Sequence, residues 1–178
     1  MSYTEMGRLD FEHNYEAVIA ADRNFAAFRS MPIVNQLSLQ EAMQMFSCMN
    51  ERRFACGETI YEAGTASSQE MYMIIKGKAS ASDRSGYKYD LLTAGDVFGL
   101  FSFLDEDRLH SATLKAEDEL VVLSIDRAYF DLITLEDPAL GYQLLKFMFR
   151  LLSKMALKQE HEYAAMHGYA FGRSHYGH

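Results

Sequence analysis

The sequence predicts a mainly β fold, a barrel or two-sheet jelly roll, with helices before and after it. Residues 52–125 contain short apolar runs separated by glycines, residues 14–29 and 39–49 carry apolar residues at helical spacing, and a helix-start signal follows at Asp137-Pro138. We expect four parts: an N-terminal helical segment over 1–50, the jelly roll over 51–125, C-terminal helices over 126–165 and a flexible tail over 166–178.

Composition narrows the class of protein. The 178 residues are 49% apolar, which predicts one globular domain. A net charge of −8 repels phosphate backbones, so we expect no nucleic-acid partner. No apolar run reaches membrane-spanning length, and the N-terminus lacks the pattern of a secretory signal. The two cysteines, Cys48 and Cys56, form no metal-binding pattern, which favours a reduced, cytoplasmic setting.

The N-terminal segment contains two helix signals. Apolar residues recur at near-helical spacing from Asn14 to Arg29, and Met31-Pro32 interrupts the pattern because the residue before proline avoids helical geometry. Ser38 and Glu41 then form a capping-box pattern, which predicts a new helix after Ser38. Cys48 falls on the apolar face of that helix and is expected in the core.

Six strands follow from the short apolar runs. Glycine-containing turns separate them, as is typical of barrels and jelly rolls. The predicted strands are Thr59–Tyr61, Met71–Ile75, Lys78–Ser82, Lys88–Leu92, Ser111–Ala116 and Leu120–Ile125.

The C-terminal part returns to helical signals. Asp126 can cap a short helix, and Asp137-Pro138 predicts the start of a long helix reaching about Tyr163. Leu145, Met148, Leu152 and Met155 recur at spacings of three and four, which is the pattern of a helix-pairing seam. We therefore predict a homodimer through the helix after Pro138.

Several motifs resemble the cyclic-nucleotide-binding domain family, which includes the catabolite activator protein and regulatory domains of cAMP-dependent kinases. They are Arg53–Gly64, Met71–Ala79, Leu92–Gly99, Ser111–Ala116 and Glu119–Ile125, in the family's order and spacing. The resemblance covers roughly residues 35–155. It implies an eight-stranded jelly roll with flanking helices and a phosphate-binding cassette.

The resemblance also implies the site. The cassette positions are Phe98, Gly99, Leu100, His110, Ser111, Ala112 and Thr113. In the family, a glutamate follows the cassette glycine to take the ribose hydroxyl, and an arginine pairs with the phosphate. Here Leu100 stands in the glutamate position and His110 in the arginine position, so we expect a degenerate cassette.

The residues leave four alternatives for this cassette. Protonated His110 replaces the arginine as the anion's partner, or Arg108 does so after the loop shifts in register. Alternatively, the pocket is filled and binds no cyclic nucleotide. In the last case, it holds a different small ligand with an apolar face against Leu100, Phe101 and Phe103.

The predicted function is that of a regulatory or sensor module without its own output domain, acting on a separate output protein. A ligand-free dimerising scaffold is the alternative, and a truncated transcription regulator is a weaker one, because a helix-turn-helix does not fit after Tyr163. We expect no catalytic residues, since no nucleophile or phosphate-binding motif is present. We also expect no metal site: a cupin needs several histidines in its barrel, and only His110 falls there. A cyclic nucleotide or other small molecule is the one ligand class that the pattern implies.

Overall fold

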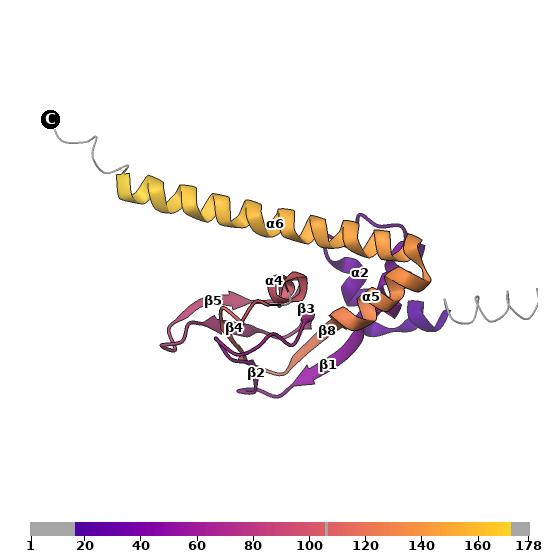
Figure 1. Ribbon diagram of the computed structural model, residues 1–178, viewed down its shortest axis with the longest axis horizontal. Helices are drawn as coiled ribbons and strands as arrows, with labels where there is room; N and C mark the ends of the chain where they lie inside the picture. The colour runs from indigo at the N-terminus through magenta and orange to yellow at the C-terminus, as the bar shows by residue number, and fades with distance from the viewer. Residues whose placement is uncertain (1–16, 106, 172–178) are drawn as a thin grey trace, which may run out of the picture.

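The computed structural model describes residues 17–105 and 107–171. Within them, eight strands form two four-stranded antiparallel sheets arranged as a jelly roll, with helices before it and a long helix after it (Figure 1). This arrangement confirms the predicted fold class. The strands are β1 (Asn50–Phe54), β2 (Thr59–Tyr61), β3 (Glu70–Lys76), β4 (Ala79–Ser82), β5 (Lys88–Leu92), β6 (Val97–Phe98), β7 (Thr113–Ala116) and β8 (Leu120–Asp126).

The eight strands divide equally between the two sheets, with β1, β6, β2 and β5 as the edge strands. One sheet has the order β1-β8-β3-β6, and the other has the order β2-β7-β4-β5. β2 and β5 have the predicted bounds, β3 is one residue longer than predicted at each end, and the other three predicted strands differ by one or two residues at one end. β1 and β6 were not predicted from apolar runs, because β1 is charged and mostly exposed and β6 has only two residues.

Two hydrophobic cores lie on opposite faces of the β1-β8-β3-β6 sheet. Along β3, Met71 and Met73 face the helices, whereas Tyr72 and Ile74 face the inside of the barrel. β8 contacts both cores and is buried almost throughout, which explains its nearly continuous apolar sequence. The sheet therefore links the barrel interior to the helices that cover it.

The N-terminal helices begin at local capping residues. Residues 17–21 are helical, and a separate helix, α2 (Arg23–Ser30), begins after Asp22, whose carboxylate accepts hydrogen bonds from the backbone of Asn24 and Phe25. The predicted continuous helix over 14–29 is therefore broken at Asp22, and residues 14–16 lie outside the described part. α3 (Leu39–Ser47) begins with the predicted capping box, in which Ser38 N–H donates to Glu41 and Glu41 N–H donates to Ser38 Oγ.

Both predicted C-terminal helix starts are confirmed. Asp126 accepts a hydrogen bond from Tyr129 N–H at 2.8 Å at the start of α5 (Arg127–Glu136). Asp137 accepts one from Leu140 N–H at 3.0 Å at the start of α6 (Pro138–Phe171). α6 continues past the predicted end at Tyr163, so residues 166–171, expected in the tail, are helical; residues 172–178 lie outside the described part.

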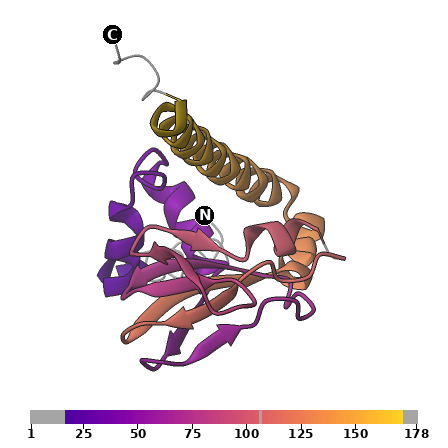
Figure 2. The same cartoon turned by 90° about the vertical axis from the view of Figure 1, so that its left-hand side faces the viewer.

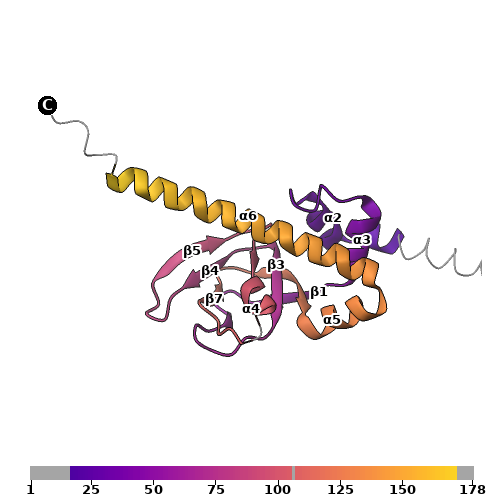
Figure 3. The same cartoon turned by 45° about the horizontal axis from the view of Figure 1, so that its top comes forward.

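α6 has one covered end and one free end. Its first half packs against the N-terminal helices and the barrel, and its last turns extend past β5 and stand clear of the strands (Figures 1, 2 and 3). Leu144, Phe147, Met148 and Leu151 are buried in the chain's own core. The predicted seam was therefore wrong at Met148, which cannot also face a partner. Among the described helices, none is both long and apolar enough to cross a membrane.

Candidate ligand-binding site

The segment β6–α4–β7 forms the candidate site. Gly99 lies between β6 and the short helix α4 (Leu100–Leu104) and has a φ of +76°. A Cβ atom at this position would lie 2.4 Å from the carbonyl oxygen of Glu70. Only glycine combines this left-handed conformation with so close a backbone approach, so Gly99 fixes where α4 leaves the barrel.

His110 lies at the other end of this segment and is 5% exposed. Its ring stacks on the ring of Tyr61 from β2, with centroids 3.8 Å apart and planes 7° apart. Its Nε2 accepts a long hydrogen bond, 3.4 Å, from the Ser68 N–H, and its backbone exchanges hydrogen bonds with Gly64 and Thr65. The side chain is thus held inside the barrel wall.

Burial determines the charge state of His110. Desolvation lowers the pKa of the imidazole from its ordinary value of 6.5. His110 is therefore mainly neutral at pH 7. A neutral imidazole that accepts a hydrogen bond at Nε2 and stacks on a tyrosine does not supply the cation that a phosphate needs.

The aromatic packing continues into the barrel from the Tyr61–His110 pair. Phe98 stacks on Tyr72 with ring centroids 4.9 Å apart, and Tyr61 lies 6.1 Å from Phe98 and 6.5 Å from Tyr72. Burial raises the pKa of the Tyr61 hydroxyl, and burial together with the Glu70 hydrogen bond raises the pKa of Tyr72 to about 12. Both hydroxyls are therefore neutral at physiological pH.

An ion pair lies beside this aromatic cluster. Arg52 Nη1 lies 2.6 Å from Glu70 Oε2, and the Tyr72 hydroxyl donates to the same carboxylate. The guanidinium carbon also lies 5.7 Å from the centre of the Tyr72 ring. Because Glu70 already pairs with Arg52, this guanidinium is not free to receive an anion without losing its carboxylate partner.

The space left at the candidate site is small. A cavity of about 40 Å³ lies between Gly99 and the stacked rings. Its lining residues are Tyr61, Gly99, Phe101, Ser102, Arg108, Leu109, His110 and Ser111. Ligand sites in proteins usually measure about 300–1,000 Å³, so this cavity has room for water but not for a nucleotide. Arg108 lies at its edge, with its guanidinium carbon 5.5 Å from the centre of the Phe101 ring.

The structure brings only some of the predicted site residues to this cavity. Gly99, His110 and Ser111 line it. Phe98 and Ala112 are buried in the barrel core, and the Thr113 hydroxyl accepts a hydrogen bond from Ala63 N–H at 3.0 Å. Leu100 is 1% exposed and packs into the core formed with the helices, so it does not line the cavity.

Tyr61 is the site residue that the sequence did not single out. It belongs to a predicted strand and to one of the family motifs, but no spacing relates it to His110, which lies two hairpins later in the chain. An aromatic residue within a strand is usually core filling. The contact that closes the cavity is visible only once β2 and the cassette are placed side by side.

The fold and this segment define a small barrel domain with a cassette between two strands, and comparisons with known proteins agree. The chain aligns with a cyclic nucleotide-binding domain from Methylobacillus flagellatus KT, with 20% identity, a TM-score of 0.66, and coverage of 78% of this chain and 81% of that one. It aligns with the catabolite activator protein of Thermus thermophilus, with 24% identity, a TM-score of 0.56, and coverage of 72% and 62%.

A third similar structure is the regulatory subunit of a cAMP-independent protein kinase A from Trypanosoma cruzi, bound to guanosine. It has 19% identity and a TM-score of 0.58, and the alignment covers 80% of this chain and 48% of that one. At these identities the likeness shows the fold. No curated protein matches the sequence.

Residues 51–137 match the family model of the cyclic nucleotide-binding domain. The match covers just under half of the chain and shows that this stretch is similar to the domains of that family. The family match agrees with the resemblance found in the sequence.

Proposed function

We propose that this domain is a regulatory module that does not recognise cAMP or cGMP through its cassette and acts as a homodimer through α6. The observation that carries the first half is the Tyr61–His110 stack, which fills the position of the cassette's anion partner with a neutral, buried ring. The packing of these two rings therefore supports the proposal of a degenerate cassette, beside the residue identities.

Binding a phosphate group in this cassette, without a cationic partner, has a large free-energy cost. Removing one partner of a buried charge pair costs about 2–5 kcal/mol, which corresponds to roughly 30- to several-thousand-fold in affinity. In addition, a nucleotide can enter only if the Tyr61–His110 stack moves away from Gly99, because the cavity that these residues line has a volume of only about 40 Å³. Both terms oppose ordinary cyclic-nucleotide binding.

Thermal-shift and calorimetric titrations with millimolar cAMP and cGMP test this half of the proposal. A ligand at one hundred times its dissociation constant adds about 2.7 kcal/mol to the free energy of unfolding, so the expected result is no shift. Saturable binding of either nucleotide refutes the proposal. In that event, an Arg108→Ala variant identifies the cation responsible: loss of binding assigns the phosphate to Arg108, and retained binding assigns it elsewhere.

Guanosine provides a separate arm of the same experiment. It has no phosphate, and the Trypanosoma cruzi regulatory subunit is bound to it. The loss of a phosphate partner alone would therefore leave nucleoside binding possible, whereas the closed cavity opposes it. We expect no guanosine binding, and saturable binding would show that the Tyr61–His110 stack opens.

The second half of the proposal rests on the unpartnered side of α6. Phe149 is 68% exposed, and other large apolar side chains along the helix are exposed in the same way. Five of these side chains, together with half-buried Leu152 and exposed Ala156 and Gln159, occupy positions with alternating spacings of three and four, which is the spacing of a two-helix seam. The positions are Tyr142, Leu145, Phe149, Leu152, Ala156, Gln159, Tyr163 and Met166.

This seam runs over about 36 Å of helix, at 1.5 Å per residue. It is separate from the buried stripe formed by Leu144, Phe147, Met148 and Leu151. One stripe therefore packs on the barrel, while the exposed positions of the other, such as Tyr142, Phe149 and Tyr163, stay available for a second copy. The revised seam replaces Met148 and Met155 with Phe149 and Ala156, which are exposed, and keeps Leu152, which is half-buried against the main core.

Light scattering during size-exclusion chromatography tests the dimer. The wild-type chain is expected at twice its monomer mass, and Phe149→Glu is expected at monomer mass because it buries a charge in the seam. Leu157→Glu is the matched control: Leu157 is exposed on α6 but lies outside the seam, so this variant stays dimeric. A monomeric wild-type protein, or dissociation of both variants alike, overturns the proposal.

A further inference from the structure

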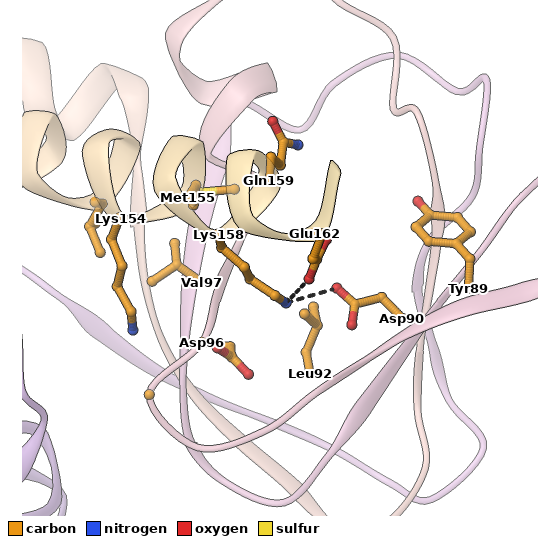
Figure 4. A pocket seen from close by; sticks show the side chains of 12 residues that line it. Tyr89, Asp90, Leu92, Asp96, Val97, Lys154, Met155, Lys158, Gln159 and Glu162 are labelled. Carbon is orange, nitrogen blue, oxygen red and sulfur yellow. Dashed lines mark ion pairs between the residues drawn. The ribbon is translucent and has the colours of Figure 1, made fainter. Parts of the chain in front are cut away.

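A second, larger cavity lies away from the cassette, beneath the second half of α6. It has a volume of about 380 Å³, within the range of small-molecule sites. Figure 4 shows it between α6 and the strand ends. Its lining residues are Tyr89, Asp90, Leu92, Gly95, Asp96, Val97, Leu151, Lys154, Met155, Lys158, Gln159 and Glu162.

The cavity is built from three elements that lie far apart in the sequence. β5 is the edge of one sheet and β6 is the edge of the other, and α6 lies across both. Leu92, Val97, Leu151 and Met155 give it an apolar lining. These side chains are buried or half-buried, so a ligand here would replace water on an apolar surface with an apolar body.

The charged groups around this lining include more carboxylates than ammonium groups. Asp90, Asp96 and Glu162 are three carboxylates, whereas Lys154 and Lys158 are two ammonium groups. Lys158 is shared, with its Nζ 3.5 Å from Asp90 Oδ2 and 3.8 Å from Glu162 Oε1 (Figure 4). Lys154 extends from α6 in about the same direction as Lys158, and no ion pair is drawn from it to the labelled carboxylates (Figure 4).

Asp96 is the carboxylate with capacity left. It is half-buried, and its Oδ2 accepts hydrogen bonds from the backbone N–H and the hydroxyl of Thr93 at 2.9 and 3.2 Å. These bonds fix the carboxylate at the cavity wall without using Oδ1. A cationic group in the cavity would therefore find an oriented acceptor and would offset the excess negative charge.

We propose that this cavity binds a small organic cation with an apolar or aromatic body. The cationic group pairs with Asp96 Oδ1, and the body packs against Leu92, Val97 and Met155. Because such a ligand contacts both sheet edges and α6, its binding stabilises the docked position of α6. The proposal does not depend on the state of the cassette, which shares no lining residue with this cavity.

Three indole compounds of matched size test the charge preference on the full chain. They are tryptamine, its neutral alcohol counterpart tryptophol, and the anion indole-3-propionate, each titrated while backbone amide signals are followed by NMR. We expect saturable binding of tryptamine, with shifts confined to residues 89–97 and 151–162, weaker binding of tryptophol and none of indole-3-propionate. Equal binding of all three, no saturable binding, or shifts centred on Tyr61 and His110 would overturn the proposal.

Variants then test the assigned residues. Asp96→Asn is expected to weaken tryptamine binding by roughly tenfold, the loss of one charge-assisted hydrogen bond, while the amide oxygen still accepts from Thr93. Met155→Trp fills the cavity from α6 and should abolish binding. Glu160→Gln removes a carboxylate of α6 that does not line the cavity and should leave affinity unchanged. If Asp96→Asn binds like the wild type, or Glu160→Gln weakens binding equally, the assignment fails.

Discussion

Replacing Gly99 with alanine tests the backbone geometry that positions the cassette. Gly99 has a φ of +76°, and a left-handed conformation costs a non-glycine residue about 1–2 kcal/mol. The added Cβ would also lie 2.4 Å from the Glu70 carbonyl oxygen and 3.2 Å from Tyr72 Cδ2. The first of these neighbours is backbone within a sheet strand and cannot rotate away, so overpacking adds about 1–3 kcal/mol.

Gly95→Ala is the matched control for this substitution. Gly95 has a φ of +91°, but a Cβ there would have no neighbour within 4 Å. It therefore carries the conformational cost of about 1–2 kcal/mol without the clash. The difference between the two variants isolates the close approach of Gly99 to β3.

Urea unfolding followed by circular dichroism measures both variants. We expect Gly99→Ala to lower the free energy of unfolding by about 2–5 kcal/mol in total, and more than Gly95→Ala does. In thermal unfolding, each 1 kcal/mol corresponds to about 2–4 °C for a chain of this size. If the two variants are equally stable, α4 does not approach β3 as described and the account of the cassette's position is wrong.

Three further predictions concern single side chains. His110 has a lowered pKa in the folded state, so the unfolded state binds more protons as the pH falls below 6.5. The contribution of neutral His110 to the free energy of unfolding should therefore be complete above pH 6.5 and should be lost as the pH falls below it. Urea midpoints measured over this acidic range should fall less steeply for His110→Phe than for the wild-type protein. A variant with an unchanged pH slope would contradict the burial of a neutral imidazole. Ellman's reagent should label exposed Cys56 quickly and Cys48 only on unfolding, since Cys48 is buried and burial raises its thiol pKa; rapid labelling of both would contradict the packing of α3. Ser38→Ala should cost about 1 kcal/mol in urea unfolding through loss of the α3 cap, and an unchanged midpoint would show that the capping box adds nothing to stability.

The parts of the fold that the sequence predicted are those controlled by local chemistry. The α3, α5 and α6 starts at Ser38, Asp126 and Asp137 follow from capping groups that act within three residues. The break at Asp22 uses the same chemistry, but the apolar spacing on both sides of it hid the signal. β1 was missed because its pairing with β8, and not its own mostly exposed side chains, makes it a strand.

Local chemistry also decides which part of the candidate site could be predicted from the sequence. The position of Gly99 follows from a motif, because a left-handed turn restricts the residue type. The stack of Tyr61 on His110 and the burial of Leu100 away from the cavity depend on how distant elements pack. The sequence could therefore name an altered cassette but could not state that an aromatic pair closes it.

The position of α6 also bears on how the chain avoids aggregation. β5 and β6 each end a sheet, and strand edges with unpaired backbone groups can add strands from other molecules. α6 lies over the side of the barrel where β5 and β6 end the two sheets, and it limits the approach of other chains from that side. Full release of the helix would expose that side, so a signal transmitted through α6 is better carried by a small slide or pivot than by detachment.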